Sequence, residues 1–347
     1  MKRNLFILLL MVLFASCQNT KQFSIDYMVP ANVSFPSQLK RIAVVNNVTE
    51  VFEIQPLQEK QTVYFNEIAG PVTESLAEHI AAANYFDEVL ICDSALRARD
   101  IFPRETTLSQ EEVKELTEDL GADVILSLEA LRIESVNAVK IALDQYLYCG
   151  TLDITVYPKV NIYIPNRSTP IAIINAADSL FWEKYGKTQT SVVPVIPVKQ
   201  MVKEIIDFAG GIPVNYLIPH WETANRYIYT GGSTEMRDAT VYVSNDQWEE
   251  AYKLWKQAAL SNRKKLQMYA ALNIAVYYEM NDKIEEAMMW AMKAQQFAHE
   301  VEKVKDETKI DYTSDYYYIT LYLTKLQVRE RNAALLNVQM ERFKEEF

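Results

Sequence analysis

The apolar residues of this 347-residue chain change their spacing once, and that change constrains the fold more than any other feature. From Lys40 to His220, short apolar runs alternate with helical stripes, which is typical of strands and helices packed in layers. From residue 236 to 347, the apolar stripes recur at helical spacing. The sequence therefore predicts an α/β domain with a mixed sheet of α+β character, followed by an all-α domain.

The first domain contains a strand followed later by a helix and another strand. The run Arg41–Val45 is continuously apolar, as in a strand that is buried on both faces. Ser109 and Glu112 are spaced as a capping box that begins a helix, and Gly121 can supply the left-handed residue that ends it. The run Asp123–Ile133 follows directly as a strand. Parallel strands are thus expected first in the sheet.

The later part of this domain alternates apolar and polar residues. Leu152–Tyr157 and Val160–Ile164 have the period of two expected of antiparallel strands, and Ile171–Ala177 is another β-rich run after a turn. Residues 160–177 show no long amphipathic hairpin that would suit a membrane pore. A helix over Val198–Phe208 is expected to end at the glycines that follow.

The second domain repeats one local pattern. Asp246–Ala251 and Asp282–Ala287 each combine a polar turn with the sequence Glu-Glu-Ala, 36 residues apart. Helices are predicted over Asn245–Leu260, Leu266–Met280 and Ile284–Phe297. Asp315–Lys344 is expected to supply a last helix that caps the stack.

The N-terminus has the pattern of a bacterial lipoprotein signal. Lys2 and Arg3 precede the apolar run Leu5–Phe14, and two small residues precede Cys17, the predicted lipidation site. The apolar run is too short to span a bilayer of roughly 30 Å. An ordinary cleaved signal and an uncleaved anchor remain as alternatives.

Composition and motif searches argue against several classes of function. The formal net charge of −11 and the absence of a basic stripe disfavour nucleic-acid binding. The few glycines form no phosphate-binding loop, and the histidines and cysteines lack zinc-ligand spacing, so no cofactor or metal is expected. The carboxylate pairs Glu111–Glu112, Glu249–Glu250 and Glu285–Glu286 open predicted helices, where negative charge favours the helix dipole. Whether Cys92 and Cys149 pair is left open.

Two resemblances follow from these motifs. Asn273–Ala275, Tyr278 and the turn Asp282–Ala287 resemble a tetratricopeptide repeat, a helical hairpin of about 34 residues. Lys40–Val45 and Thr117–Leu126 are similar to the small α/β domain shared by the N-terminal part of the Tol periplasmic protein and the curli-secretion lipoproteins. Together with the lipoprotein signal, the chain resembles uncharacterised Bacteroidota lipoproteins. The resemblance implies an architecture and a location.

The expected domains follow from these patterns. They are a signal peptide over 1–16, a flexible tether over 17–38, the α/β domain over 39–220, a linker over 221–235 and the repeat-like helical domain over 236–347. Residues Gln18–Lys21 lack the acidic run that marks surface export in Bacteroidota lipoproteins, which favours the periplasmic face of the outer membrane.

The function expected from the sequence is non-enzymatic. A protein partner is expected to bind the helical repeats, the N-terminal lipid is expected to bind the membrane, and self-association is a further expectation carried by the α/β resemblance. A glycan-binding lipoprotein of a polysaccharide-uptake system is the alternative. The candidate partner-binding residues are the aromatic residues Trp248, Trp255, Tyr277, Tyr278 and Trp290.

Overall fold

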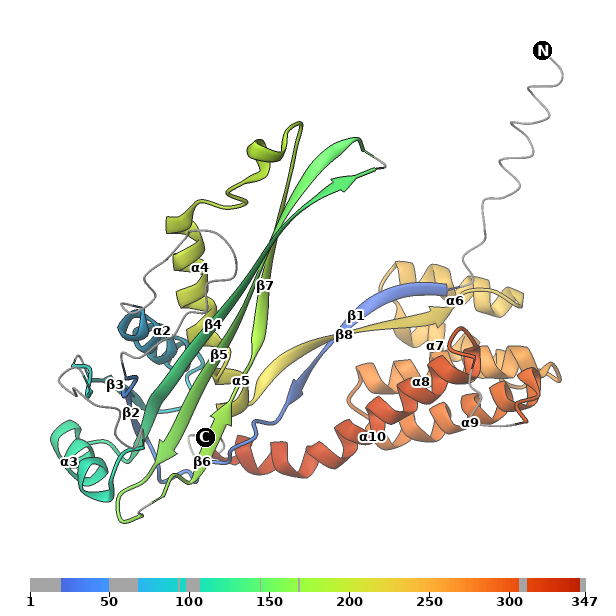
Figure 1. Ribbon diagram of the computed structural model, residues 1–347. Coiled ribbons are helices and arrows are strands. Elements are labelled where there is room, and N and C mark those ends of the chain that lie inside the picture. The colour runs from blue at the N-terminus through green and yellow to red at the C-terminus, as the bar shows by residue number, and fades with distance from the viewer. Residues whose placement is uncertain are drawn as a thin grey trace. The chain divides into compact units, whose positions relative to one another are not determined.

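The computed structural model describes residues 20–49, 68–92, 94–97, 107–143, 145–167, 169–305 and 311–343. These residues divide into two compact units (Figure 1). The sheet unit consists of the described residues of Pro30–His220 and Val338–Phe347, and the helical unit consists of those of Met1–Val29 and Trp221–Asn337. The predicted signal peptide and Cys17 lie outside the described residues.

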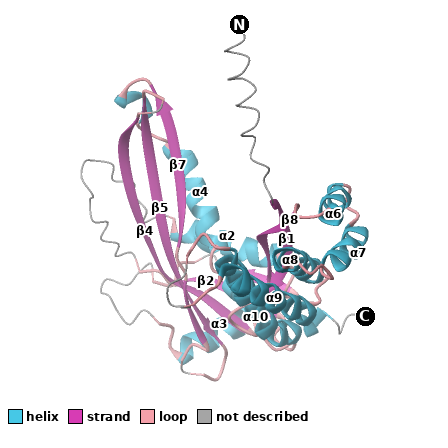
Figure 2. Cartoon of the chain, turned by 90° about the vertical axis from the view of Figure 1, so that its right-hand side faces the viewer, coloured by secondary structure: helices cyan, strands magenta, loops and turns pink. Residues whose placement is uncertain are grey.

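The sheet unit contains a mixed sheet, as predicted. Its strands are β2 (Arg41–Asn46), β3 (Glu88–Ile91), β4 (Val124–Ala142), β5 (Leu147–Tyr163), β6 (Ala172–Asn175) and β7 (Asp178–Gly186). β2 pairs in parallel with β3 and β4, whereas β5 pairs antiparallel with β4, β6 and β7. β6 and β7 both pair with β5, at Lys159–Ile162 and Tyr148–Val156 respectively. The long strands β4, β5 and β7 run side by side in Figure 2.

Helices cover both faces of this sheet. They are α2 (Ala69–Ala82), α3 (Gln110–Leu120), α4 (Val198–Gly211) and α5 (Val214–Leu217), with a short 3-10 helix η2 (Gln189–Val192) before α4. Ile42 and Val44 of β2 belong to the core that includes α2 and α4, whereas Ala43 and Val45 belong to the core that includes α3. Alternate residues of a strand point to opposite faces. The predicted strand is therefore confirmed as buried on both faces.

The contact between α2 and α4 depends on a small residue. A Cβ atom added to Gly210 of α4 would lie 2.4 Å from the Ser75 hydroxyl and 2.7 Å from the Leu76 backbone nitrogen, both in α2. Real Cβ atoms do not approach other atoms that closely. The absence of a side chain at Gly210 therefore allows the two helices to pack.

The predicted boundaries of α3 are confirmed. The Ser109 hydroxyl accepts a hydrogen bond from the Glu112 backbone N–H at 3.2 Å, and the Glu112 carboxylate accepts one from the Ser109 N–H at 2.7 Å. Gly121 follows the helix with φ of +63°, in the left-handed region. Both ends of α3 are thus fixed by residues within or next to it.

The antiparallel strands are longer than the sequence predicts. The two predicted strands over 152–157 and 160–164 are a single strand, β5, and its partner β4 continues to Ala142 rather than ending at Ile133. The two strands pair along almost their whole length, with one register shift between Leu128 and Ala130. Local patterning missed this because the distal part of β4 is exposed, so its residues show little apolar period.

The predicted tether and linker are corrected. Residues 20–29 of the expected tether form strand β1 (Thr20–Val29), and most of the expected linker forms β8 (His220–Tyr229), to which β1 pairs. Hydrogen bonds between polar side chains join the two strands, so their residues do not show the apolar alternation that predicts a strand. Ser24 donates to Asn225 at 3.1 Å, and Tyr27 donates to Glu222 at 2.8 Å.

The helical unit combines this β-ribbon with successive helices. They are α6 (Thr234–Ser244), α7 (Trp248–Ala258), α8 (Lys264–Met280), α9 (Ile284–Glu302) and α10 (Asp315–Met340), which belongs to this unit as far as Asn337. The short η3 (Glu341–Phe343) follows α10 and belongs to the sheet unit. α6 packs on α7, α7 on α8, and α8 on α9. Small side chains allow the close contacts, since Ala251, Ala287, Ala291 and Ala294 are fully buried. No helix in the described ranges is long and apolar enough to cross a membrane.

The end of the chain corrects the predicted boundary of the helical domain. Residues Val338–Phe343, the last that the structure describes, belong to the sheet unit rather than to the helical stack. The Gln339 side chain accepts a hydrogen bond from the Ala31 N–H at 2.8 Å and donates to the Ala31 carbonyl at 3.0 Å. Arg342 donates to the Leu39 carbonyl at 2.8 Å. These bonds join the last residues to the segment that leads into β2, a pairing that no local pattern indicates.

Candidate functional site: an acidic aromatic pocket in the helical unit

The helical unit uses the same turn twice. Asp246, between α6 and α7, and Asp282, between α8 and α9, both have positive φ, of 59° and 55°. The next residue bonds back to the preceding helix in each case: the Gln247 N–H donates to the Tyr242 carbonyl at 2.9 Å, and the Lys283 N–H to that of Tyr278 at 3.0 Å. The predicted 36-residue repeat of this turn is therefore confirmed at the level of the backbone.

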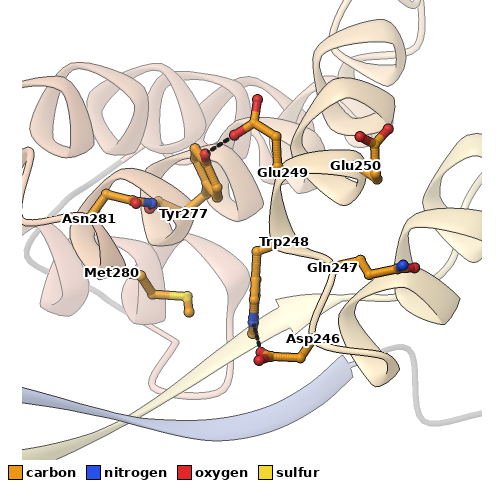
Figure 3. A pocket seen from close by; sticks show the side chains of 8 residues that line it. All are labelled: Asp246, Gln247, Trp248, Glu249, Glu250, Tyr277, Met280 and Asn281. Atoms are coloured by element: carbon orange, nitrogen blue, oxygen red, sulfur yellow. Dashed lines mark hydrogen bonds between the residues drawn. The ribbon is translucent and has the colours of Figure 1, made fainter.

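The first of these turns borders a pocket of about 500 Å³ (Figure 3). It lies where the start of α7 faces the C-terminal end of α8. Its lining combines acidic, aromatic and amide side chains with one methionine: Asp246, Gln247, Trp248, Glu249, Glu250, Tyr277, Met280 and Asn281.

Trp248 is held in place from two sides. Its indole N–H donates a hydrogen bond to the Asp246 carboxylate at 2.8 Å (Figure 3). Its ring lies 5.0 Å from that of Phe23 in β1 and 6.4 Å from that of Trp255, measured between ring centroids. The ring is only partly buried. Trp248 therefore offers an ordered aromatic surface to the pocket.

Tyr277 forms the aromatic part of the opposite wall. Its ring stacks on that of Tyr252 with centroids 4.5 Å apart, and its hydroxyl donates a hydrogen bond to the Glu249 carboxylate. This hydrogen bond and partial burial raise the pKa of Tyr277 to about 12. Tyr277 is thus a neutral donor at physiological pH.

The pocket is negatively charged. Its acidic lining residues are Asp246, Glu249 and Glu250, and none of the described residues that line it is a lysine or an arginine. Lys253 lies 2.7 Å from Glu250 and offsets that charge. The hydrogen-bond donors to Asp246 and Glu249 are the neutral Trp248 and Tyr277 side chains, which leave both charges in place.

Comparison with known proteins identifies the family. The family model described as a domain of unknown function (DUF8603) matches residues 39–229, which is more than half of the chain. The chain belongs to the DUF8603 family. A second family model, described as a domain of unknown function (DUF6340), matches residues 237–328, within the helical unit. No curated protein matches this DUF8603 chain.

A solved structure also shows a limited likeness. The hypothetical protein CT253 from Chlamydia trachomatis, determined at 1.65 Å resolution, is 12% identical to this DUF8603 protein. The match covers 50% of this chain and 96% of that chain, with a TM-score of 0.22. A likeness of this size supports no inference about fold or function.

The five aromatic residues predicted to bind a partner do not form one surface in this DUF8603 protein. Trp248 and Tyr277 line the pocket, and Tyr278 lies beside it, its hydroxyl 2.8 Å from that of Tyr252. Trp290 instead contacts the ammonium groups of Lys256 and Lys293, at 4.8 and 4.2 Å from its ring centroid. Trp255 is fully buried, so the expectation that it contacts a partner is corrected: it packs the helical core.

Sequence reasoning missed the acidic wall of the pocket. The local pattern assigns Glu249 and Glu250 only to the helix dipole, and both do lie in the first turn of α7. Asp246 and Met280 were not singled out. The sequence signal that could have indicated the pocket is the tryptophan at position 248, between acidic residues. The equivalent position of the second hairpin holds Ile284, which is not aromatic.

The cysteines and the possible metal-binding side chains of the described residues do not form a second site. Cys92 and Cys149 are both free thiols, which answers the question of their pairing. Within the part of the chain that the structure describes, no group of three or more His, Cys, Asp or Glu side chains is placed to hold a metal ion. The Trp248 pocket is therefore the site from which we argue function.

Proposed function

We propose that this DUF8603 protein is a membrane-tethered lipoprotein of the cell envelope that binds a protein partner without catalysis. The helical unit carries the binding role, and the acidic aromatic pocket at Trp248 is the observation on which the proposal rests. Protein interfaces are enriched in tryptophan, tyrosine and methionine, and their binding energy is concentrated in a few anchored aromatic residues. Trp248, Tyr277 and Met280 supply that set in one place.

The proposed architecture of the helical unit is tetratricopeptide-like. Its support is the repeated Asp246 and Asp282 turn, together with the buried alanines Ala251 and Ala287 at equivalent positions of the two hairpins. In such repeats small residues stand where helices touch.

The proposed location is the periplasmic face of the outer membrane. It rests on the basic start at Lys2 and Arg3, the apolar run Leu5–Phe14 and the cysteine at position 17. In this arrangement Cys17 carries the lipid and the folded units act as an adaptor or assembly factor in the envelope.

Site-directed photocrosslinking in the native envelope tests the proposal. A photoreactive residue at Gln247, on the pocket wall, should capture a reproducible protein partner. The control position is Leu260, which is 83% exposed and lies after α7, outside the pocket. Capture of the same proteins from both positions, or of none from Gln247, would contradict the proposal.

A glycan ligand is the second candidate. The observation that favours it is the partly exposed Trp248 ring beside carboxylate and amide groups of Asp246, Gln247 and Asn281, because sugars stack on aromatic rings and hydrogen-bond to such groups. Affinity electrophoresis over a panel of polysaccharides separates the two candidates. A mobility shift that is lost in Trp248→Ala would favour the glycan.

A further inference from the structure

We infer that the Trp248 pocket accepts a basic side chain, lysine or arginine, from the protein partner. The inference rests on the proposed protein-binding function and specifies the chemistry of the bound residue. It is drawn from three features of the pocket, namely its charge, its aromatic surface and its apolar floor.

The first feature is the sign of the charge. Asp246 and Glu249 accept hydrogen bonds from Trp248 and Tyr277, which carry no charge. Lys253 lies 2.7 Å from Glu250 and also interacts electrostatically with Glu249. Among the described residues, the pocket therefore presents three carboxylates against one lysine. A phosphate or carboxylate ligand would be repelled there, whereas an ammonium or guanidinium group would be attracted.

The second feature is the aromatic surface. A cation placed over the face of tryptophan is attracted by the negative charge of the ring face. The protein uses this contact elsewhere, since Lys256 and Lys293 both lie over Trp290, and Arg329 lies 4.5 Å from the ring centroid of Tyr27. Trp248 has no such intramolecular cation over its ring among the contacts of the described residues.

The third feature is the lining at Met280. Lysine and arginine carry an apolar stem of three or four methylene groups behind the charged group. Met280 and the Trp248 ring supply apolar surface for that stem, and the Asp246 carboxylate, which accepts from the Trp248 indole N–H, meets the charged end. Glu249 and Glu250 add to the negative potential of the lining. The pocket thus matches both parts of a basic side chain.

The chain offers a matched control for the charge. Glu285 and Glu286 occupy the same two positions of α9 that Glu249 and Glu250 occupy in α7, and they do not line the pocket. The variants E249Q/E250Q and E285Q/E286Q remove equal charge from equivalent first turns. A difference in peptide binding between the two double variants is therefore due to the pocket and not to the net charge or the helix dipole.

A peptide array probed with the full mature protein in detergent tests the inference directly. Peptides that carry a central lysine or arginine should bind at least about tenfold more tightly than the same peptides with norleucine or citrulline, which are neutral and of similar shape. This preference should weaken as salt concentration rises, be lost in E249Q/E250Q and persist in E285Q/E286Q. Equal binding of basic and neutral peptides, or equal effects of the two double variants, would overturn the inference.

The two proposals can fail separately. If the Gln247 crosslinker captures a partner but the array shows no basic preference, the protein-binding function stands and the basic side chain is ruled out. If the array shows the preference but envelopes yield no captured protein, the pocket binds cations and the adaptor function fails. Thermal unfolding of each double variant verifies that it folds. Glu249, Glu250 and Glu285 are exposed and Glu286 is half-buried, so none of the four substitutions opens the core.

Discussion

The guanidinium of Arg226 donates two hydrogen bonds to the carboxylate of Glu279, at 2.8 and 2.7 Å, and both side chains are almost completely buried. Arg226 lies on β8 and Glu279 on α8, so the pair fixes the β-ribbon to the helices. Arg329 of α10 adds a third bond to Glu279 at 2.8 Å. One buried carboxylate thus joins three elements of the helical unit.

The substitution Glu279→Ala should destabilise the helical unit by about 3–5 kcal/mol, because it leaves buried guanidinium groups without a counter-ion. Urea unfolding measures the change. The control is Glu300→Ala, which removes an exposed ion pair with Lys264 at 3.1 Å and should change the free energy of unfolding by less than about 1 kcal/mol. Similar effects of the two variants would show that the Glu279 network does not hold the unit together.

Gln339 should be required for the stability of the sheet unit. Gln339→Leu leaves the buried N–H and carbonyl of Ala31 without the side chain that bonds both, at a cost of about 2–4 kcal/mol. Gln296→Leu on the exposed side of α9 is the matched control, and we expect it to change stability little. Chemical denaturation measures the free energy of unfolding of both variants. A denaturation midpoint of Gln339→Leu equal to that of the natural protein would contradict the prediction.

The two tryptophans of α7 should separate stability from binding. Trp255 is fully buried, so Trp255→Ala should lower the free energy of unfolding by about 3–5 kcal/mol. Trp248→Ala should cost less stability because its ring is partly exposed, but it should abolish crosslinking from Gln247. Denaturation and crosslinking measured on the same preparations check this. Retained crosslinking in a folded Trp248→Ala protein would remove Trp248 from the site.

Substitution of two glycines by alanine should have opposite effects on stability, because only one of them lies at a helix contact. Gly210→Ala should destabilise the sheet unit by about 1–3 kcal/mol, because the new Cβ would overlap Ser75. Gly70→Ala in the first turn of α2 has open space around it and should be neutral or stabilise by about 0.5–1 kcal/mol. Thermal unfolding of both variants measures the difference. Equal melting temperatures would mean that α2 and α4 can separate without cost.

Glu129 should give the sheet unit a specific pH dependence. Burial raises the pKa of this carboxyl, and hydrogen bonds from Asn47 at 2.6 Å and Tyr163 at 2.9 Å offset only part of that effect. The folded state therefore holds this proton to higher pH than the unfolded chain. Its contribution to stability is fully present below the unfolded-state pKa and declines as pH rises through the folded-state pKa.

The variant Glu129→Gln cannot titrate at this position. Its deficit in unfolding free energy relative to the natural protein should therefore shrink as pH rises from about 4 to about 8. Urea denaturation across this range measures the deficit, with Glu118→Gln as a control for removing an exposed carboxylate. A deficit that grows with pH would mean that the Glu129 pKa is lowered rather than raised.

Several helix ends, turns and strands of this protein can be predicted from residues that are neighbours in the sequence. The capping box of Ser109 and Glu112, the stop at Gly121 and the repeated turns at Asp246 and Asp282 each depend on neighbours within a few positions, so local spacing predicts them. The buried run Arg41–Val45 is predicted for the same reason, since a strand covered on both faces needs apolar residues throughout.

The tertiary structure alone decided the rest. β1 and β8 are joined by side chains about 200 positions apart, such as Ser24 and Asn225, and their polar residues read locally as a tether and a linker. The pocket likewise needs Trp248, Tyr277 and the supporting ring of Phe23 from three separate elements. The sequence determined which segments can form helices and strands, because those preferences are local. Which polar residues meet depends on long-range packing, for which the local spacing of residues in a single sequence carries no signal.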